Sequence, residues 1–140
     1  MIPLAILLAP PVTYVPYANA RYGFAVDRPA FLTPQRPPDN GDGREFRAGG
    51  IVMRVYAGWN VDESTPASAL RAAIPKGVKP DITVLKAGWY ALSYVDKRVI
   101  HYEKTFVSRT KHTTVEFEYP TTEGKRMGPV VTHVVRSFRP

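Results

Sequence analysis

The apolar residues between Pro129 and Phe138 constrain the fold of this chain more than any other stretch. At the helical period of about 100° per residue they fall within an arc of roughly 140°, and polar residues fill the rest. This apolar set consists of Val130, Val131, Val134, Val135 and Phe138. In a strand the same residues would not segregate, and Gly128 followed by Pro129 is typical of a helix start. The pattern predicts an amphipathic helix over residues 129–138, whose apolar face needs a sheet to pack on.

The residues before this helix are predicted to form strands joined by short turns. The predicted strands are Ile82–Lys86, Trp89–Val95, Arg98–Val107 and Lys111–Tyr119, and a polar, basic loop is expected over Thr121–Met127. In the last strand Val115, Phe117 and Tyr119 alternate with Thr114, Glu116 and Glu118, which predicts that the second set faces water. We expect the C-terminal helix to pack with Val130, Val134 and Phe138 on Trp89, Val115 and Phe117.

The sequence of the first half of the chain predicts fewer helices and strands. We expect a strand over Arg21–Arg28, a hairpin of Glu45–Ala48 with Ile51–Ala57, and a helix that Thr65-Pro66 opens and Pro75 ends. The Asn40-Gly41-Asp42-Gly43 stretch has glycines where a calcium loop needs ligands, so it predicts a turn. Hairpin-linked strands with segregated helices predict an α+β fold: a single twisted antiparallel sheet of about six to seven strands flanked by helices.

Positive charge is concentrated in the second half of the chain. The net charge is +7; residues 1–70 balance six Arg with six acidic residues, and residues 71–140 hold thirteen Lys or Arg and six acidic residues. Such an excess is typical of proteins that bind an anionic partner, and it also occurs on a basic face that only aids solubility. The candidate interaction surface consists of Arg98, Lys104, Arg109, Lys111, Lys125 and Arg126, and its expected partner is an acidic protein surface.

An apolar stretch opens the chain. Pro3–Pro11 is far shorter than the roughly 20 residues that a membrane span requires, and it resembles part of a secretory signal. We therefore divide the chain into residues 1–13, an apolar arm or signal-peptide remnant, and residues 14–140, a single domain. The expected location is the bacterial periplasm or the exterior; the alternative is a cytoplasmic protein whose arm packs on the domain.

Two groups of residues resemble a known family. Tyr22–Pro29 followed by Asn40–Phe46, and later Trp89–Ser93, Phe117–Pro120 and Arg136–Phe138, resemble mostly exported bacterial domains that have a PsbP-like fold and no assigned function. That fold is shared by an extrinsic photosystem subunit, a Ran-binding nuclear import factor and chaperones of secreted bacterial effectors. The resemblance implies a protein-binding domain that is not an enzyme. Tyr94–Arg98 departs from the family pattern, which is often glycine-rich there.

The residues predict no catalytic, cofactor or metal site. The chain has no cysteine, and its histidines, His101, His112 and His133, are not spaced to share a face locally. It also lacks the serine elbow and the glycine-rich phosphate loop. Aromatic and basic residues interleave between Tyr90 and Lys111, a pattern that some sheets use to bind single-stranded nucleic acid.

We therefore expect a non-enzymatic binding or accessory domain that works through protein contacts in the periplasm. The alternatives are a cytoplasmic chaperone of a secreted effector and, less favoured, a nucleic-acid-binding domain that uses the basic second half.

Overall fold

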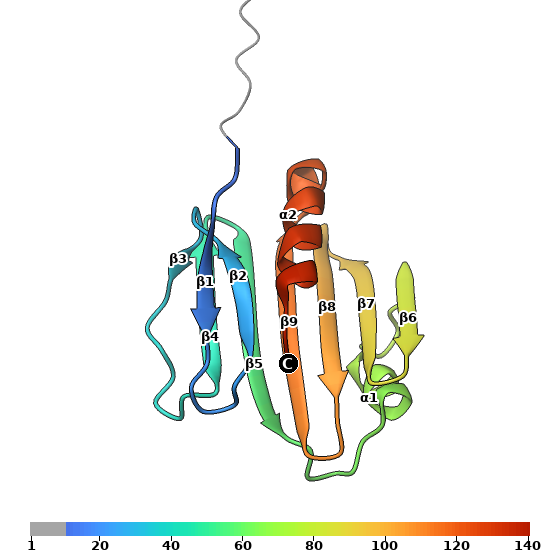
Figure 1. Ribbon diagram of the computed structural model, residues 1–140. Helices are drawn as coiled ribbons and strands as arrows, with labels where there is room; N and C mark the ends of the chain where they lie inside the picture. The colour runs from blue at the N-terminus through green and yellow to red at the C-terminus, as the bar shows by residue number, and fades with distance from the viewer. Residues whose placement is uncertain (1–10) are drawn as a thin grey trace, which may run out of the picture.

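A sheet of antiparallel strands organises residues 11–140, the part of the chain that the computed structural model describes (Figure 1). Within these residues its seven strands follow the order β3-β4-β5-β9-β8-β7-β6. They are β3 Thr33–Pro34, β4 Gly43–Ala48, β5 Ile51–Trp59, β6 Ile82–Lys86, β7 Trp89–Asp96, β8 Val99–Val107 and β9 Lys111–Pro120. A small second sheet pairs β1 Tyr14–Ala18 with β2 Ala25–Pro29. The predicted α+β class with a six- to seven-stranded antiparallel sheet is confirmed.

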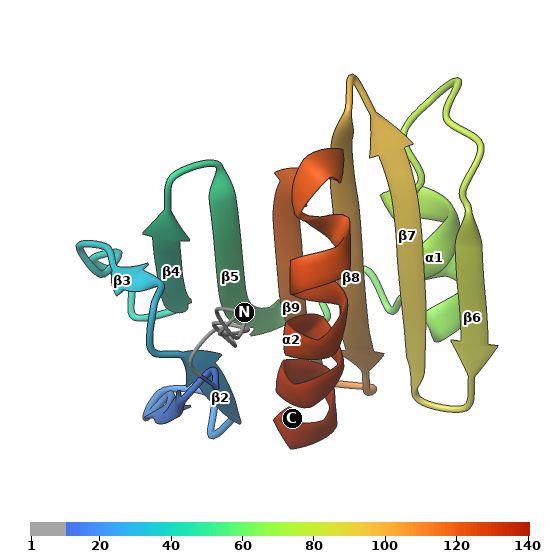
Figure 2. The ribbon, with the colours of Figure 1, turned by 90° about the horizontal axis from the view of Figure 1, so that it is seen from above.

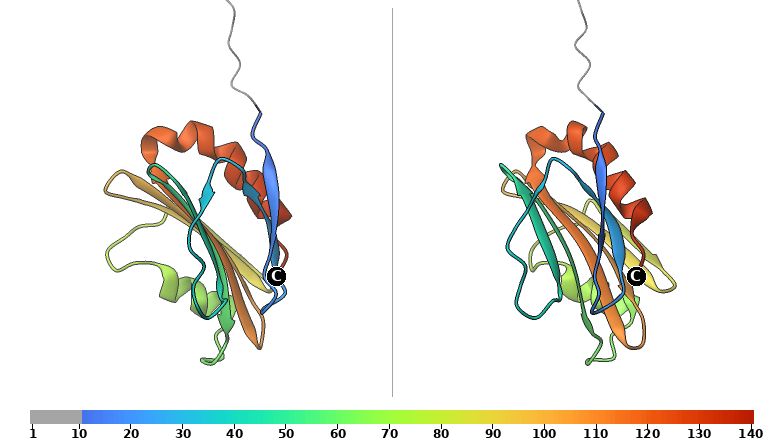
Figure 3. Two further views of the ribbon diagram at one scale, coloured as in Figure 1. Left: turned by 90° about the vertical axis from the view of Figure 1, so that its left-hand side faces the viewer. Right: turned by 60° about the vertical axis from the view of Figure 1, so that its left-hand side comes forward.

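The two helices, α1 Pro66–Ala73 and α2 Gly124–Ser137, lie on opposite faces of the sheet (Figure 3). Seen from above, α2 crosses β9 and β8, whereas α1 lies behind β6 and β7 (Figure 2). We call the two sides the α2 face and the α1 face. Because successive residues of a strand point to opposite faces, each strand supplies both sides.

The main core lies between the sheet and α2. Met53, Val55, Val115 and Phe117 of the sheet are buried there with residues of α2. The helix contributes Met127, Val130, Val131 and Val134, and Phe138 follows directly after it. The expected packing of the helix on Val115 and Phe117 is therefore present. Trp89 is not part of this core, because its ring lies beneath the Lys104 ammonium, with 4.0 Å between Nζ and the ring centroid.

The C-terminal helix begins earlier than the sequence predicts. The expected loop over Thr121–Met127 is instead a short 3-10 helix, η1 Thr121–Glu123, followed by the first turn of α2. Met127 is fully buried and extends the apolar stripe one turn toward the N-terminus. Pro129, predicted to start the helix, lies inside it, where its missing N–H leaves one helical hydrogen bond unmade.

The N-terminal hairpin was only partly predicted. The expected strand over Arg21–Arg28 begins at Ala25, and β1 was not predicted at all. The Asn19 side chain holds the connecting turn, accepting from the Tyr22 N–H at 2.8 Å and donating to the Gly41 carbonyl at 2.9 Å. Residues 1–10 of the predicted N-terminal arm lie outside the described residues.

Helix α1 agrees with its prediction and covers only part of its face. Thr65 caps it, accepting from the Ser68 N–H at 3.1 Å, and the helix ends at Ala73 before Pro75. Leu70 packs against Tyr90, Leu92 and Val107, which form a second, smaller core. The helix spans eight residues, and its main contacts are with β6, β7 and β8. The rest of the α1 face carries polar side chains.

Candidate functional site

A network of ion pairs lies on the part of the α1 face that the helix leaves uncovered. Arg54 of β5 is at its centre, with Nε 2.7 Å from Glu45 Oε1 and Nη1 3.2 Å from Glu116 Oε1 and 3.3 Å from Glu118 Oε1. Glu116 and Glu118 were expected to face water, but both are half-buried and bind this guanidinium. The prediction missed Arg54 because it belongs to a strand that is distant in sequence and adjacent in the sheet.

A cleft of about 580 Å³ opens between α1 and this network. Tyr56 of β5, Tyr90 of β7, Glu103 of β8 and Glu116 of β9 line its sheet side. The helix contributes three small side chains, Ala69, Ala72 and Ala73. The residues that line the cleft include Asp62, Glu103 and Glu116 but no lysine or arginine, although the chain carries a net charge of +7. The cleft is therefore an acidic region of a basic protein.

Two glutamates lie opposite each other on the sheet side of the cleft. Glu103 and Glu116 are register partners on β8 and β9, so their side chains share one face. The Tyr90 hydroxyl donates to Glu103 Oε2 at 3.3 Å, and the Tyr56 hydroxyl donates to Glu116 Oε2 at 3.2 Å. Glu116 forms an ion pair with Arg54, whereas Tyr90 is the one side-chain hydrogen-bond partner of Glu103 within residues 11–140.

Burial changes the ionisation of these groups. Desolvation, followed by the negative charge of Glu116, raises the pKa of Glu103 to about 7. Desolvation also raises the pKa of Tyr90 to about 12, and it raises the pKa of Tyr56. A carboxyl group that titrates near neutral pH in a cleft is typical of binding and catalytic sites. The sequence marks this pair only through strand register. The predicted turn at Ser108–Thr110 pairs Glu103 with Val115, one residue away from the register that the structure has.

The histidines lie far apart. His101 and His112 do share the α1 face, but their positions on β8 and β9 differ by six register steps, about 20 Å. His133 is on α2, where its ring stacks on Tyr14 and Nε2 lies 3.2 Å from Asp27 Oδ2. His112 Nε2 is buried without a hydrogen-bond partner among the described residues. Within the same residues, no group of three or more metal-binding side chains could hold a metal ion.

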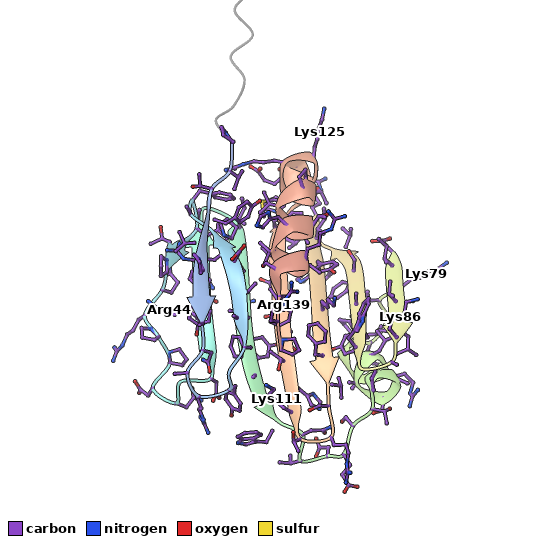
Figure 4. The ribbon with its side chains drawn as sticks, in the orientation of Figure 1. Arg44, Lys79, Lys86, Lys111, Lys125 and Arg139 are labelled. Atoms are coloured by element: carbon purple, nitrogen blue, oxygen red, sulfur yellow. The ribbon has the colours of Figure 1, made fainter. Side chains whose placement is uncertain are left out.

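The six residues of the predicted basic surface do not form one patch. Arg109 and Lys111 lie at the β8–β9 turn, and Lys125 and Arg126 at the start of α2, so β8, about 30 Å long, separates the two pairs (Figure 4). Arg98 lies near the second pair, because its carbonyl accepts from the Thr121 N–H at 2.9 Å.

Three basic residues of that set make local contacts. Lys104 lies between the two pairs, and burial lowers its pKa. Lys111 donates to the Tyr22 carbonyl at 2.8 Å. Arg126 lies over the Phe31 ring, with 4.7 Å between Cζ and the ring centroid.

These features define an α+β domain whose antiparallel sheet carries a helix on each face. Its structure is similar to the solution structure of cyanobacterial PsbP (CyanoP) from Synechocystis sp. PCC 6803, with a TM-score of 0.63 and 13% sequence identity. The match covers 90% of this chain and 91% of that chain. The fold is therefore PsbP-like, as the sequence resemblance implied.

Sequence comparison adds no family assignment to this likeness of fold. No protein-family model matches the chain, and no curated protein matches it. Across residues 11–140, none of the helices has the length and apolar character needed to cross a membrane.

Proposed function

We propose that this chain is a non-enzymatic binding or accessory domain whose outer strand, β6, pairs with an extended acidic segment of a partner protein. The observation that supports this proposal is that the outer edge of β6 is open. Strand β6 pairs with β7 on one side and has no strand on its other side within the described residues. Ile82 and Leu85 are 57% and 50% exposed. An exposed edge of this kind is a template for adding a further strand.

The opposite edge of the same sheet supports this interpretation by contrast. Strand β3 has two residues, and one of them is Pro34, which cannot donate to a neighbouring strand. Short strands and prolines are common ways to protect an edge from pairing. Strand β6 has five residues and no proline, and Thr83-Val84-Leu85 at its centre carries no charge. The sheet is therefore protected at one edge and open at the other.

Charge next to β6 favours an acidic partner. Lys86 is the register partner of Trp89, whose ring Lys104 covers from the same face. Lys79 precedes the strand, and Figure 4 shows Lys79 and Lys86 on the outer side of the sheet. Lys79 and Lys86 therefore flank the position of a peptide strand added beside β6, whereas Lys104 belongs to β8, two strands further in. Carboxylates at alternate positions of such a strand would complement them.

The same geometry gives less support to nucleic-acid binding. Tyr90 and Tyr94 lie on the α1 face with Glu103, Glu116 and Glu118, whose charges repel phosphate. Tyr102 and Phe106 lie on the other face, partly buried against the core that α2 covers. The aromatic and basic residues that interleave in the sequence are thus divided between two faces.

We further propose that the protein works in the bacterial periplasm. The support is the signal-like Pro3–Pro11 stretch and the resemblance to exported domains. Cell fractionation and N-terminal sequencing in the native host would test this. A mature start near residue 11 in the periplasmic fraction is expected, whereas an intact Met1 in the cytosol contradicts export and favours the cytoplasmic chaperone alternative.

A defined peptide tests the edge proposal. We expect the capped peptide Glu-Val-Glu-Thr-Glu-Val-Glu-Thr to bind and to slow hydrogen exchange of β6 amides, while the same peptide with lysine for glutamate does not. Lys86→Glu should weaken binding by up to about tenfold, because a surface attraction of up to about 1 kcal/mol becomes a repulsion. Lys125→Glu makes the same charge change away from β6 and should have little effect. Unchanged β6 exchange, or equal effects of both variants, contradicts the proposal.

A further inference from the structure

We propose that the cleft between α1 and the sheet is a binding site for an organic cation: an alkyl-guanidinium or alkyl-ammonium group, free or on the side chain of a peptide. This site lies on the α1 face and is independent of the β6 edge. Its ligand differs in charge from the acidic segment proposed for that edge.

The dimensions of the cleft fit a small ligand. Its volume of about 580 Å³ lies within the range of roughly 300–1,000 Å³ that small-molecule pockets occupy. The space exists because α1 presents Ala69, Ala72 and Ala73 toward it. Leu70, the one large apolar residue in that part of the helix, points instead into the small core with Tyr90 and Leu92. The helix thus anchors itself at one side and leaves room at the other.

The charge of the cleft selects a cation. Nineteen lysine and arginine residues are present in the chain, yet none lines the cleft, whereas Asp62, Glu103 and Glu116 do. A desolvated carboxyl group in a protein either pairs with a cation or shifts its pKa upward and takes up a proton. Arg54 pairs with Glu116, but within residues 11–140 no cationic side chain forms an ion pair with Glu103. A ligand head group would bind beside Glu103, where this carboxylate lacks a cationic partner.

An aromatic wall and hydrogen-bond acceptors complete the site. Tyr56 is 39% exposed and its hydroxyl donates to Glu116, and an aromatic face next to carboxylates attracts guanidinium and ammonium groups. The two glutamates are direct cross-strand partners, so their oxygens can accept hydrogen bonds from one planar head group. The alkyl stem would lie along the alanines of α1, which are apolar and small.

Proton and cation compete for Glu103 in this arrangement. The charged and titratable groups around it come from four strands and the cleft lining: Glu116 and Glu118 on β9, Tyr90 and Tyr94 on β7, His101 on β8, Arg54 and Tyr56 on β5, and Asp62 and His112 in the lining. Because its pKa is about 7, Glu103 is largely ionised at pH 8 and largely protonated at pH 6. Cation binding should therefore weaken by about tenfold from pH 8 to pH 6, the ratio of the ionised fractions.

Calorimetric titration of the full chain with butylguanidinium tests the proposal. This probe stays charged across the pH range, and butylurea has a similar shape without the charge. At pH 8 we expect butylguanidinium to bind with a dissociation constant of about 1 mM or tighter and butylurea not to bind. A capped Gly-Arg-Gly peptide distinguishes the sources: similar affinity indicates that the head group suffices, and tighter binding indicates a peptide segment; both support the site.

Variants locate the binding. Glu103→Gln removes the charge and should reduce affinity at least tenfold at pH 8 and abolish the pH dependence. Ala72→Trp, at an exposed helix position, should block the cleft while every carboxylate remains. Glu123→Gln removes one charge near the start of α2 and serves as the control, with an expected change below twofold. Circular dichroism first checks that each variant is folded. The proposal is overturned if butylguanidinium does not bind at pH 8 or if butylurea binds equally well. It is also overturned if Glu103→Gln or Ala72→Trp leaves the affinity unchanged, or if the control loses as much affinity as they do.

Discussion

Glu103→Gln should make the protein more stable at pH 8 than the wild type, and much less so at pH 5. Ionising Glu103 in the folded protein is unfavourable, because it is largely desolvated and lies opposite Glu116. The amide of glutamine has nearly the same shape and can still accept the hydrogen bond from Tyr90. The substitution therefore removes the titration and keeps the packing.

The magnitude follows from the two pKa values of the carboxyl group. Its pKa rises from 4.5 to about 7 on folding, so the folded state holds the proton more tightly and this group favours folding at low pH. The advantage is fully present below pH 4.5 and is lost as the pH rises through 7. With 1.36 kcal/mol per pKa unit, the ionisation of Glu103 lowers the free energy of unfolding by about 2.5 kcal/mol between pH 5 and pH 8.

Urea unfolding of the wild type and Glu103→Gln at pH 5, 6, 7 and 8 measures this effect. The difference in unfolding free energy between the two proteins should shift by about 2.5 kcal/mol in favour of the variant across that range. Glu123→Gln, near the start of α2, is the matched control and should show a shift below about 0.5 kcal/mol. If the Glu103→Gln difference is constant with pH, the carboxyl group is not desolvated and the reasoning fails.

Two further predictions concern the folded scaffold. Lys97 and Arg98 both have positive φ angles, 48° and 63°, in the β7–β8 turn, and Asn-Gly adopts this backbone with less strain. The double variant Lys97→Asn, Arg98→Gly should therefore raise the free energy of unfolding by about 1–2 kcal/mol in urea titrations. A loss of stability would show that the basic side chains support the turn. Met127→Ala should cost about 2–5 kcal/mol in the same assay because its side chain is fully buried, whereas Lys125→Ala in the same turn should change little; a Met127→Ala cost under 1 kcal/mol would contradict the early start of α2.

The sequence predicts those elements whose signals are local. Alternation in Lys111–Tyr119, and the Thr65 cap before Pro66, gave β9 and α1 nearly their true ends. The start of α2 was misplaced because Gly128-Pro129 is a strong local start signal, while the burial of Met127 depends on the sheet. Strand β1 was missed because it contains Pro16, which is uncommon inside a strand, and because its partner β2 is held by contacts to α2 that are distant in sequence.

The cleft depends on contacts between segments that are distant in sequence, so the sequence alone gave little of it. Glu116 was placed toward water because its partners Arg54 and Tyr56 belong to β5. The raised pKa of Glu103 requires both the β8–β9 register and the position of α1. The basic residues were predicted to form one surface because they are close in sequence. In the structure they lie at opposite ends of β8.

The pairing of β5 with β9 also determines when the sheet can be completed during synthesis. Val52 pairs with Glu118, so the central seam of the sheet joins the first half of the chain to one of its last segments. During synthesis, the β4–β5 hairpin therefore has an unpaired edge until β9 leaves the ribosome. Such long-range pairing slows folding, and open edges invite association with other chains. A nascent chain of this protein therefore exposes the open edge of β5 to other chains until residue 120 is available.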